Sequence, residues 1–172
     1  MAVKMDEGLV AHGLWNLPVY SAGGGMGFAM MGGMEAMKRG VPEIDGLPAE
    51  LEWVNEPAEW SYGGGRLEIA APGKTDWFRS PTDGAVAEAA PLLLFKAARE
   101  FRLTARVATA MEGTWDAGAL MVFADKENWG KLAFEKSAYM EPTIVSVVTR
   151  GVSDDCNAQV VEAGGAWLRI GT

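Results

Sequence analysis

Short stretches of alternating apolar and polar residues recur along the chain from residue 47 onward. In FRLTARVATA, for example, the apolar residues alternate with Arg102, Thr104 and Arg106. Successive side chains of a strand point to opposite faces of a sheet, so this pattern predicts a strand with one buried face. Turn signals such as APGK and PTDG separate the stretches, and no long helical period interrupts them. The pattern therefore predicts an all-β protein, built as an antiparallel sandwich or barrel.

The stretch WDAGALMVFADKENWGKLAFE, from Trp115 to Glu135, predicts a β-hairpin. An apolar run that ends at Phe123 meets the polar turn ADKEN, and a second strand follows. In the second strand Leu132 and Phe134 share the face that we expect to be core. The opposite face carries Trp129, Lys131, Ala133 and Glu135. That face is either a ligand-binding surface or an ordinary solvated surface.

Residues 1–46 differ in composition from the rest of the chain. The run GGGMGFAMMGGM is almost entirely Gly and Met, and Gly adds no side chain to a core. A membrane span is disfavoured, because Asn16, Pro18 and Ser21 interrupt the uncharged stretch. The glycines also match neither the dinucleotide-binding pattern nor the P-loop pattern. We therefore predict a flexible or loosely packed extension at residues 1–46 and a sandwich domain at residues 47–172.

Charge and cysteine content narrow the possible partners. The formal net charge of the 172 residues is -8, which argues against nucleic acid because phosphate binding needs clustered Lys and Arg. The single Cys156 has no partner for an internal disulfide, so the fold does not depend on oxidation. We expect a cytoplasmic location and no cofactor.

Candidate catalytic and metal-binding residues are sparse. Glucanases built on β-sandwiches use an E-x-D-x-E strand, and no such spacing occurs here. The single His12 lies in the extension, which removes Ser-His-Asp and Cys-His arrangements within the sandwich. Asp154 and Asp155 could offer oxygens to Ca²⁺, but two adjacent aspartates more often form an ordinary turn. We predict no catalytic residue and no metal site.

Several segments resemble a known family. They are WSYGGGRLEI, TDWFRSPTDG, APLLLF, FRLTARV, DAGALMVFADKENWGKLAFE, SVVTRGVSDD and AWLRI. Together they resemble the regulation-of-enolase-protein-like family, a domain of unknown function with the concanavalin A-like lectin/glucanase fold. The resemblance runs from about Leu47 to Ile170 and implies a jelly-roll β-sandwich. The chain departs from the family pattern at Cys156, where an aromatic residue is more usual.

The resemblance also implies that the strand of Trp129 and the strand TIVSVVTR are neighbours on a concave sheet. The residues predicted to line a groove there are Trp129, Lys131, Glu135, Thr149, Arg150 and Trp77. A flat aromatic ring beside hydrogen-bonding side chains suits the face of a sugar. We therefore predict non-catalytic binding of a carbohydrate or another small polar ligand.

Two alternatives are left open. Family members would continue with further strands beyond the AWLRI segment, so we expect the sandwich to lack its last strands and to have an open edge. Such an edge favours a structural or protein-interaction module that pairs with a partner strand. A glycoside hydrolase is the other alternative, and it would use Glu135.

Overall fold

The computed structural model describes residues 2–5, 14–22, 40–162 and 164–172, and these form fourteen strands. A seven-stranded sheet has the order β13 (Val152–Val160), β12 (Pro142–Arg150), β11 (Asn128–Lys136), β10 (Ala117–Asp125), β1 (Ala2–Met5), β8 (Leu92–Ala97) and β3 (Leu51–Val54). A five-stranded sheet has the order β14 (Ala166–Gly171), β9 (Arg102–Thr109), β2 (Leu14–Ala22), β5 (Arg66–Ala70) and β4 (Glu59–Gly63). The short strands β6 (Trp77–Arg79) and β7 (Val86–Glu88) form a separate hairpin.

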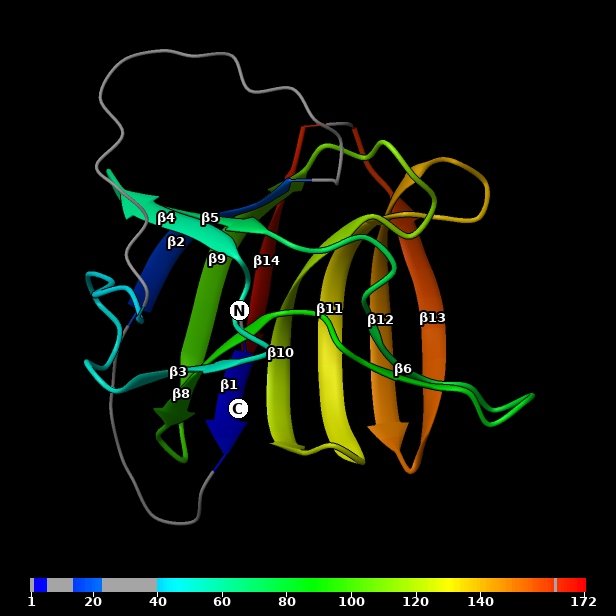
Figure 1. Ribbon diagram of the computed structural model, residues 1–172, viewed down its shortest axis with the longest axis horizontal. Coiled ribbons are helices and arrows are strands. Elements are labelled where there is room, and N and C mark those ends of the chain that lie inside the picture. Colours follow the sequence, from blue (N-terminus) through cyan, green and yellow to red (C-terminus); the bar gives the residue numbers. More distant parts are fainter. Residues whose placement is uncertain (1, 6–13, 23–39, 163) are drawn as a thin grey trace.

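The two large sheets pack face to face and enclose the main core (Figure 1). In β9, Leu103, Ala105 and Val107 are fully buried, as the alternation in FRLTARVATA predicts. Leu120 and Phe134 contribute from the seven-stranded sheet. The predicted all-β sandwich is thus confirmed, while jelly-roll connectivity stays a prediction.

The outer face of the seven-stranded sheet is covered in part by the β6–β7 hairpin (Figure 1). A second apolar cluster lies beneath this hairpin. Its members are Trp77, Leu92, Leu94, Met121, Phe123, Trp129, Ala133, Val145 and Val147. Both faces of β10 and β11 are therefore buried, although the sequence led us to expect only one apolar face.

Strands β1 and β2 come from the first 46 residues and lie inside the two sheets. β1 pairs in parallel with β10 and β8, and β2 pairs in parallel with β5 and β9. The structure thus shows strand pairing in the segment that we expected to be loosely packed. The whole Gly/Met-rich run GGGMGFAMMGGM and His12 lie outside the described residues, so the division of the chain at residue 46 stays a prediction.

Within the described residues, no helix is long and apolar enough to cross a membrane.

Candidate functional site

The predicted hairpin is present as β10 and β11. The two strands pair antiparallel from Ala117↔Glu135 to Asp125↔Asn128. Asp125 organises the turn, because its Oδ1 accepts hydrogen bonds from the Glu127 amide at 2.8 Å and from Asn128 Nδ2 at 2.9 Å. The Asn128 side chain and the Glu127 amide hold the pKa of the Asp125 carboxyl below its ordinary value, because they stabilise the ionised form.

The predicted site residues divide between the two faces of the sheet. Thr149 lies opposite Trp129 in the β11–β12 ladder, so the two share the face under the β6–β7 hairpin. Arg150 lies opposite Asn128, one position further along, and therefore belongs to the other face. Thr149 is buried and its hydroxyl lies 2.8 Å from that of Ser153. The structure places Trp129, Lys131, Glu135 and Thr149 on one face of the sheet and Arg150 on the other.

Trp77 and Trp129 meet edge to face beneath the hairpin. Their ring centroids are 6.5 Å apart at an interplanar angle of 85°, and both side chains are buried. Each indole N–H is satisfied by a backbone carbonyl, that of Ala90 at 2.8 Å for Trp77 and that of Lys126 at 3.3 Å for Trp129. Neither ring offers an exposed face for stacking, so both are packing residues in this structure rather than a sugar platform.

Lys131 of β11 forms hydrogen bonds with residues at the start of β6. Its Nζ donates to Asp76 Oδ1 at 2.9 Å and to the Trp77 carbonyl at 2.8 Å. The Lys131 side chain is only 10% exposed, whereas Asp76 is 52% exposed. The ion pair is therefore half-buried, and its Asp76 side still faces solvent.

Arg79, which the sequence analysis did not single out, links strand β7 to the β10–β11 and β12–β13 turns. Its guanidinium contacts Glu88 at 2.8 Å and Glu127 at 3.1 Å, and its Nε donates to the Gly151 carbonyl at 2.7 Å. Its backbone N–H donates to Ser153 Oγ at 2.9 Å. The planar guanidinium can donate in several directions at once, which suits this role. The signal available in the sequence was the DWFRSP segment, which we used only for the family resemblance.

Glu135 is the unusual member of the site. It is buried, yet no hydrogen-bond donor among the described residues reaches its carboxyl group. Thr143 lies directly opposite in the ladder, but its hydroxyl donates to the Glu141 carbonyl at 3.0 Å instead. The one fully enclosed side-chain polar atom without a partner in the described chain is Thr109 Oγ1, so the Glu135 oxygens keep some contact with solvent.

Burial raises the pKa of Glu135 to about 7, because desolvation disfavours the charged form. The positive charge of Lys131 lowers that pKa, while the negative charges of Asp76 and Asp155 raise it. Glu135, Lys131 and Asp76 therefore form one electrostatic unit, which we call the Glu135 cluster. A carboxyl with such a pKa is close to half-ionised at neutral pH.

Metal-ligating residues do not gather in the described part of the chain. No group of three or more His, Cys, Asp or Glu side chains is placed there to hold an ion. Asp154 and Asp155 are neighbours on β13, so their side chains point to opposite faces of the sheet. Cys156 is exposed.

Comparisons with known proteins support the resemblance inferred from the sequence. Regulation of enolase protein 1 of Saccharomyces cerevisiae is 29% identical to the chain over 121 residues, which make up 69% of this chain and 60% of that protein. The crystal structure of a functionally unknown protein from Saccharomyces cerevisiae matches with a TM-score of 0.58 and 26% identity, covering 71% of this chain and 66% of its own. The chain thus spans less than two thirds of the length of each.

A match to a protein-family model shows which family the chain belongs to. It matches residues 53–172, a range that contains Trp77, Lys131 and Glu135. The matched range covers well over half of the chain. The predicted membership is therefore confirmed, and the chain belongs to the family described as protein of unknown function (DUF1349).

Proposed function

We propose that the protein binds a small polar ligand of the carbohydrate class, without catalysis, at the Glu135 cluster. The observation that carries the proposal is the Glu135 carboxyl, which is buried and lacks a hydrogen-bond donor among the described residues. Its oxygens keep some contact with solvent, so water can donate to them when no ligand is bound. Ligand hydroxyl groups would supply the donors that the protein does not.

Asp76 adds a second acceptor to the site. Lys131 and the Trp77 amide both donate to its Oδ1, while Oδ2 accepts no hydrogen bond from the described residues. A carbohydrate carries several hydroxyl donors on one rigid ring, so it can engage two carboxyl groups together. The Trp77 amide holds Asp76 Oδ1 in place, and the Trp77 ring is itself packed against Trp129.

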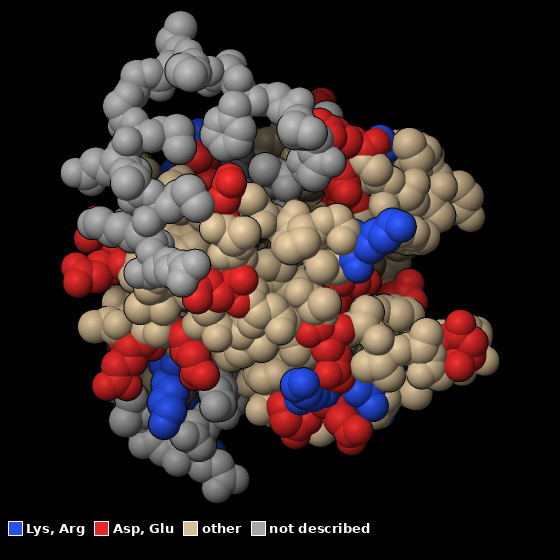
Figure 2. Space-filling model, viewed as in Figure 1, with Lys and Arg blue, Asp and Glu red and all other residues tan. Residues whose placement is uncertain are grey.

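The charge distribution on this face also suits a neutral, hydroxyl-rich ligand. Figure 2 shows Lys and Arg side chains in small groups beside Asp and Glu on the described part of the face. Arg79 and Lys126 are both paired with Glu88. These two cations are thus already paired with a carboxylate within the protein.

A glycan array tests this proposal. We expect wild type to bind a defined set of glycans, and we expect Glu135→Leu to lose them because it removes the acceptor while keeping an apolar volume. Glu141→Leu is the matched control, since Glu141 is exposed and lies outside the cluster. No binding by wild type, or equal binding by both variants, would contradict the proposal.

A glycoside hydrolase is the second candidate, and the pKa of Glu135 favours it. A general acid works best when its pKa lies near the operating pH, and the pKa of Glu135 is about 7. Against this role, its carboxylate neighbour Asp76 is held in an ion pair with Lys131. Sugar release from a substrate panel that Glu135→Gln abolishes would establish hydrolysis; no turnover by wild type would rule it out.

We also infer a cytoplasmic location and no nucleic-acid partner. The supporting observations are the single, exposed Cys156 and the net charge of -8. Imaging of the tagged full chain in cells checks the location, and retention on heparin at physiological salt would argue against the expected lack of nucleic-acid affinity.

A further inference from the structure

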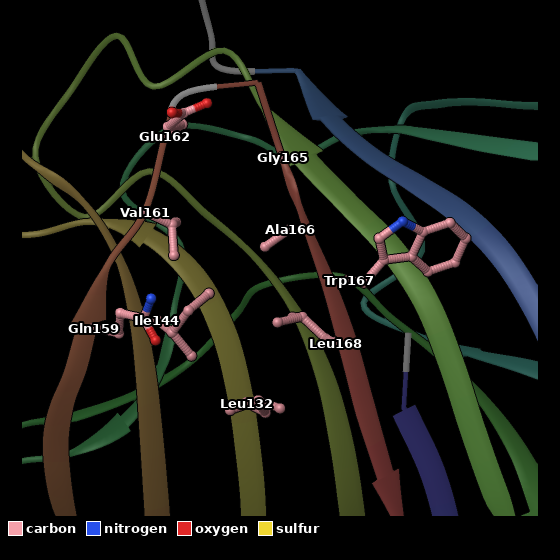
Figure 3. A pocket seen from close by; sticks show the side chains of 9 residues that line it. All are labelled: Leu132, Ile144, Gln159, Val161, Glu162, Gly165, Ala166, Trp167 and Leu168. Atoms are coloured by element: carbon pink, nitrogen blue, oxygen red, sulfur yellow. The ribbon is translucent and has the colours of Figure 1, made fainter.

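The outer face of the five-stranded sheet is basic where β9 and β14 pair. Figure 3 shows the Trp167 side chain directed away from a pocket between the two sheets, and alternation places Arg169 on the same outer face. Trp167 lies opposite Arg106 in the ladder, and Gly171 lies opposite Arg102. Neither β9 nor β14 contains an Asp or a Glu. The two strands thus present Arg102, Arg106 and Arg169 on one surface, which we call the arginine face.

Two of these arginines carry a charge that no described residue compensates. Arg102 and Arg169 are exposed, and neither forms an ion pair with a described residue. Arg169 donates through Nε to the Thr104 hydroxyl at 3.2 Å, which is a neutral partner. Gly171 has no side chain, so the long Arg102 side chain can reach past it toward the edge of β14. Both cations are therefore available to acidic groups that lie beside β14.

β14 is the outermost strand of its sheet, and no strand among the described residues pairs with its free edge. The Thr172 amide donates to the Phe101 carbonyl at 3.1 Å, so every second residue counted back from Thr172 directs its backbone groups to β9. The N–H and C=O groups of Trp167, Arg169 and Gly171 therefore point to the free edge. An antiparallel strand added there would place a residue opposite each of them, with its side chain on the arginine face.

The other side of such a strand would meet an apolar surface. β14 packs over β10 and β11, while β12 and β13 extend past it and form a ledge (Figure 1). A pocket of about 490 Å³ lies between the ledge and β14, and Leu132, Ile144 and Leu168 point into it (Figure 3). Further along the ledge, Val148 is 57% exposed. The inward side chains of an added strand should therefore be apolar.

The strand register selects acidic side chains for the outward positions, although the whole chain carries a net charge of -8. Glu162 lines the pocket and Asp154 lies opposite Val148 on the ledge, so both acids meet the inner, apolar side of the added strand. The outward side chains lie instead beside Arg169 and, across Gly171, near Arg102. Opposite charges on neighbouring strands are stabilising, whereas like charges are destabilising.

A second copy of this chain does not fit the edge. Antiparallel pairing of β14 with its own copy would place the two five-stranded sheets in one layer, with both seven-stranded sheets on the same side. Each ledge projects beyond β14 by two strands, which is about 10 Å at the usual strand spacing, so the two ledges would occupy the same space. β14 also has no acidic residue to place beside Arg169. The occupant must instead be a single, narrow, extended segment.

We propose that β14 binds an extended segment of a partner protein, with alternating acidic and apolar residues, as an added antiparallel strand. Antiparallel pairing is the more stable arrangement per residue. The acidic side chains lie on the arginine face, and the apolar side chains fill the pocket and cover the ledge. This site lies on the opposite side of the seven-stranded sheet from the Glu135 cluster and does not depend on the proposed carbohydrate binding.

Fluorescence anisotropy with the labelled, capped peptide TVEVEVET tests the proposal on the full chain. We expect saturable binding by wild type. The neutral peptide TVQVQVQT and the basic peptide TVKVKVKT should both bind more weakly, because neither places a negative charge on the arginine face. The peptide TSESESET should also bind more weakly, because it keeps the acidic residues but lacks apolar side chains for the pocket.

Charge reversal at Arg169 tests the arginine face directly. Arg169→Glu should weaken binding of TVEVEVET by about fivefold or more, because it replaces an attraction with a repulsion at a neighbouring position. It should also strengthen binding of TVKVKVKT. Arg66→Glu is the matched control, since Arg66 is exposed on the same sheet but lies on β5, separated from β14 by β9 and β2. Its affinity for TVEVEVET should stay within about twofold of wild type at physiological ionic strength. Circular dichroism checks that both variants are folded.

Two N-methylated peptides separate strand addition from binding to the arginines alone. In the antiparallel arrangement, the Glu amides of TVEVEVET point to β14 and the Val amides point away from it. Methylation of the Glu amides should therefore abolish binding, whereas methylation of the Val amides should preserve it. Binding by the Glu-methylated peptide, no saturable binding of TVEVEVET, or equal affinity of Arg169→Glu and wild type would overturn the proposal.

Discussion

Lys131 and Asp76 are 55 positions apart in the sequence, yet the Lys131 ammonium lies 2.9 Å from Asp76 Oδ1. This contact, with a second hydrogen bond to the Trp77 carbonyl, joins the middle of β11 to the start of β6. It holds the β6–β7 hairpin over the outer face of the seven-stranded sheet and places the negative charge of Asp76 near Glu135.

Replacing Lys131 should loosen the hairpin. We expect Lys131→Met to lower the free energy of unfolding by about 1–3 kcal/mol, because it removes two hydrogen bonds from a half-buried site. Urea denaturation measures the change. Lys126→Met is the control: the Lys126 side chain is 67% exposed and its pair with Glu88 should contribute under about 0.5 kcal/mol. Equal effects of the two variants would count against the assigned role of Lys131.

Arg79 should not be replaceable by lysine. A lysine is a single point charge and cannot contact Glu88, Glu127 and the Gly151 carbonyl together as the guanidinium does. We expect Arg79→Lys to lower the free energy of unfolding by about 1–3 kcal/mol. Faster hydrogen exchange in the β10–β11 and β12–β13 turns should accompany it. The conservative Arg66→Lys, on the exposed face of β5, should change stability by less than about 0.5 kcal/mol.

Stability should depend on pH through Glu135. Its pKa is raised from 4.5 to about 7 in the folded protein, so the folded state keeps a proton that the unfolded state has already released. Stability therefore falls as pH rises through this window, and the loss is complete above the folded pKa. Glu135→Gln cannot ionise, so its stability relative to wild type should increase by about 2 kcal/mol between about pH 5 and about pH 8, allowing for solvent screening. Denaturation at both pH values measures this, and a constant difference would contradict it.

Gly171 allows the end of β14 to pack closely against the backbone next to β9. A Cβ there would lie 2.5 Å from the Phe101 carbonyl oxygen, so the backbone would have to shift. We expect Gly171→Ala to destabilise the protein by about 2 kcal/mol or more. At Gly63 an added Cβ meets no atom within 4 Å, and Gly63→Ala should therefore be neutral or slightly stabilising. Thermal unfolding compares the two, and similar melting temperatures would show that β14 is not packed as described.

The alternation of apolar residues was enough to predict the sandwich and the β10–β11 hairpin, because strand periodicity reports directly which side chains share a face. It also placed Trp129, Lys131 and Glu135 together. It could not show that this face is covered, since the β6–β7 hairpin that covers it is 40 or more residues away in sequence. Burial of Trp129 by Trp77 is a tertiary contact, and no local pattern encodes it.

The position of Arg150 shows a different limit. Sequence proximity to Thr149 suggested a shared groove, but neighbouring residues of a strand point to opposite faces, and the ladder pairs Arg150 with Asn128. If the alternation rule had been applied to β12 as it was to β11, it would have placed Thr149 and Arg150 on opposite faces of the sheet. Arg79 was missed because its role depends on strand β7 and two turns, which meet only in the folded protein.

The central claim is that Glu135 is a buried acceptor whose donors come from a ligand. The most direct measurement is NMR of protein carrying ¹³C at the glutamate side-chain carboxyls, titrated with a panel of neutral saccharides. The Glu135 resonance is assigned by its absence in Glu135→Gln. We predict that it shifts saturably with at least one saccharide, while the Glu141 resonance does not move. A Glu135 resonance that stays unchanged with every saccharide would contradict the account.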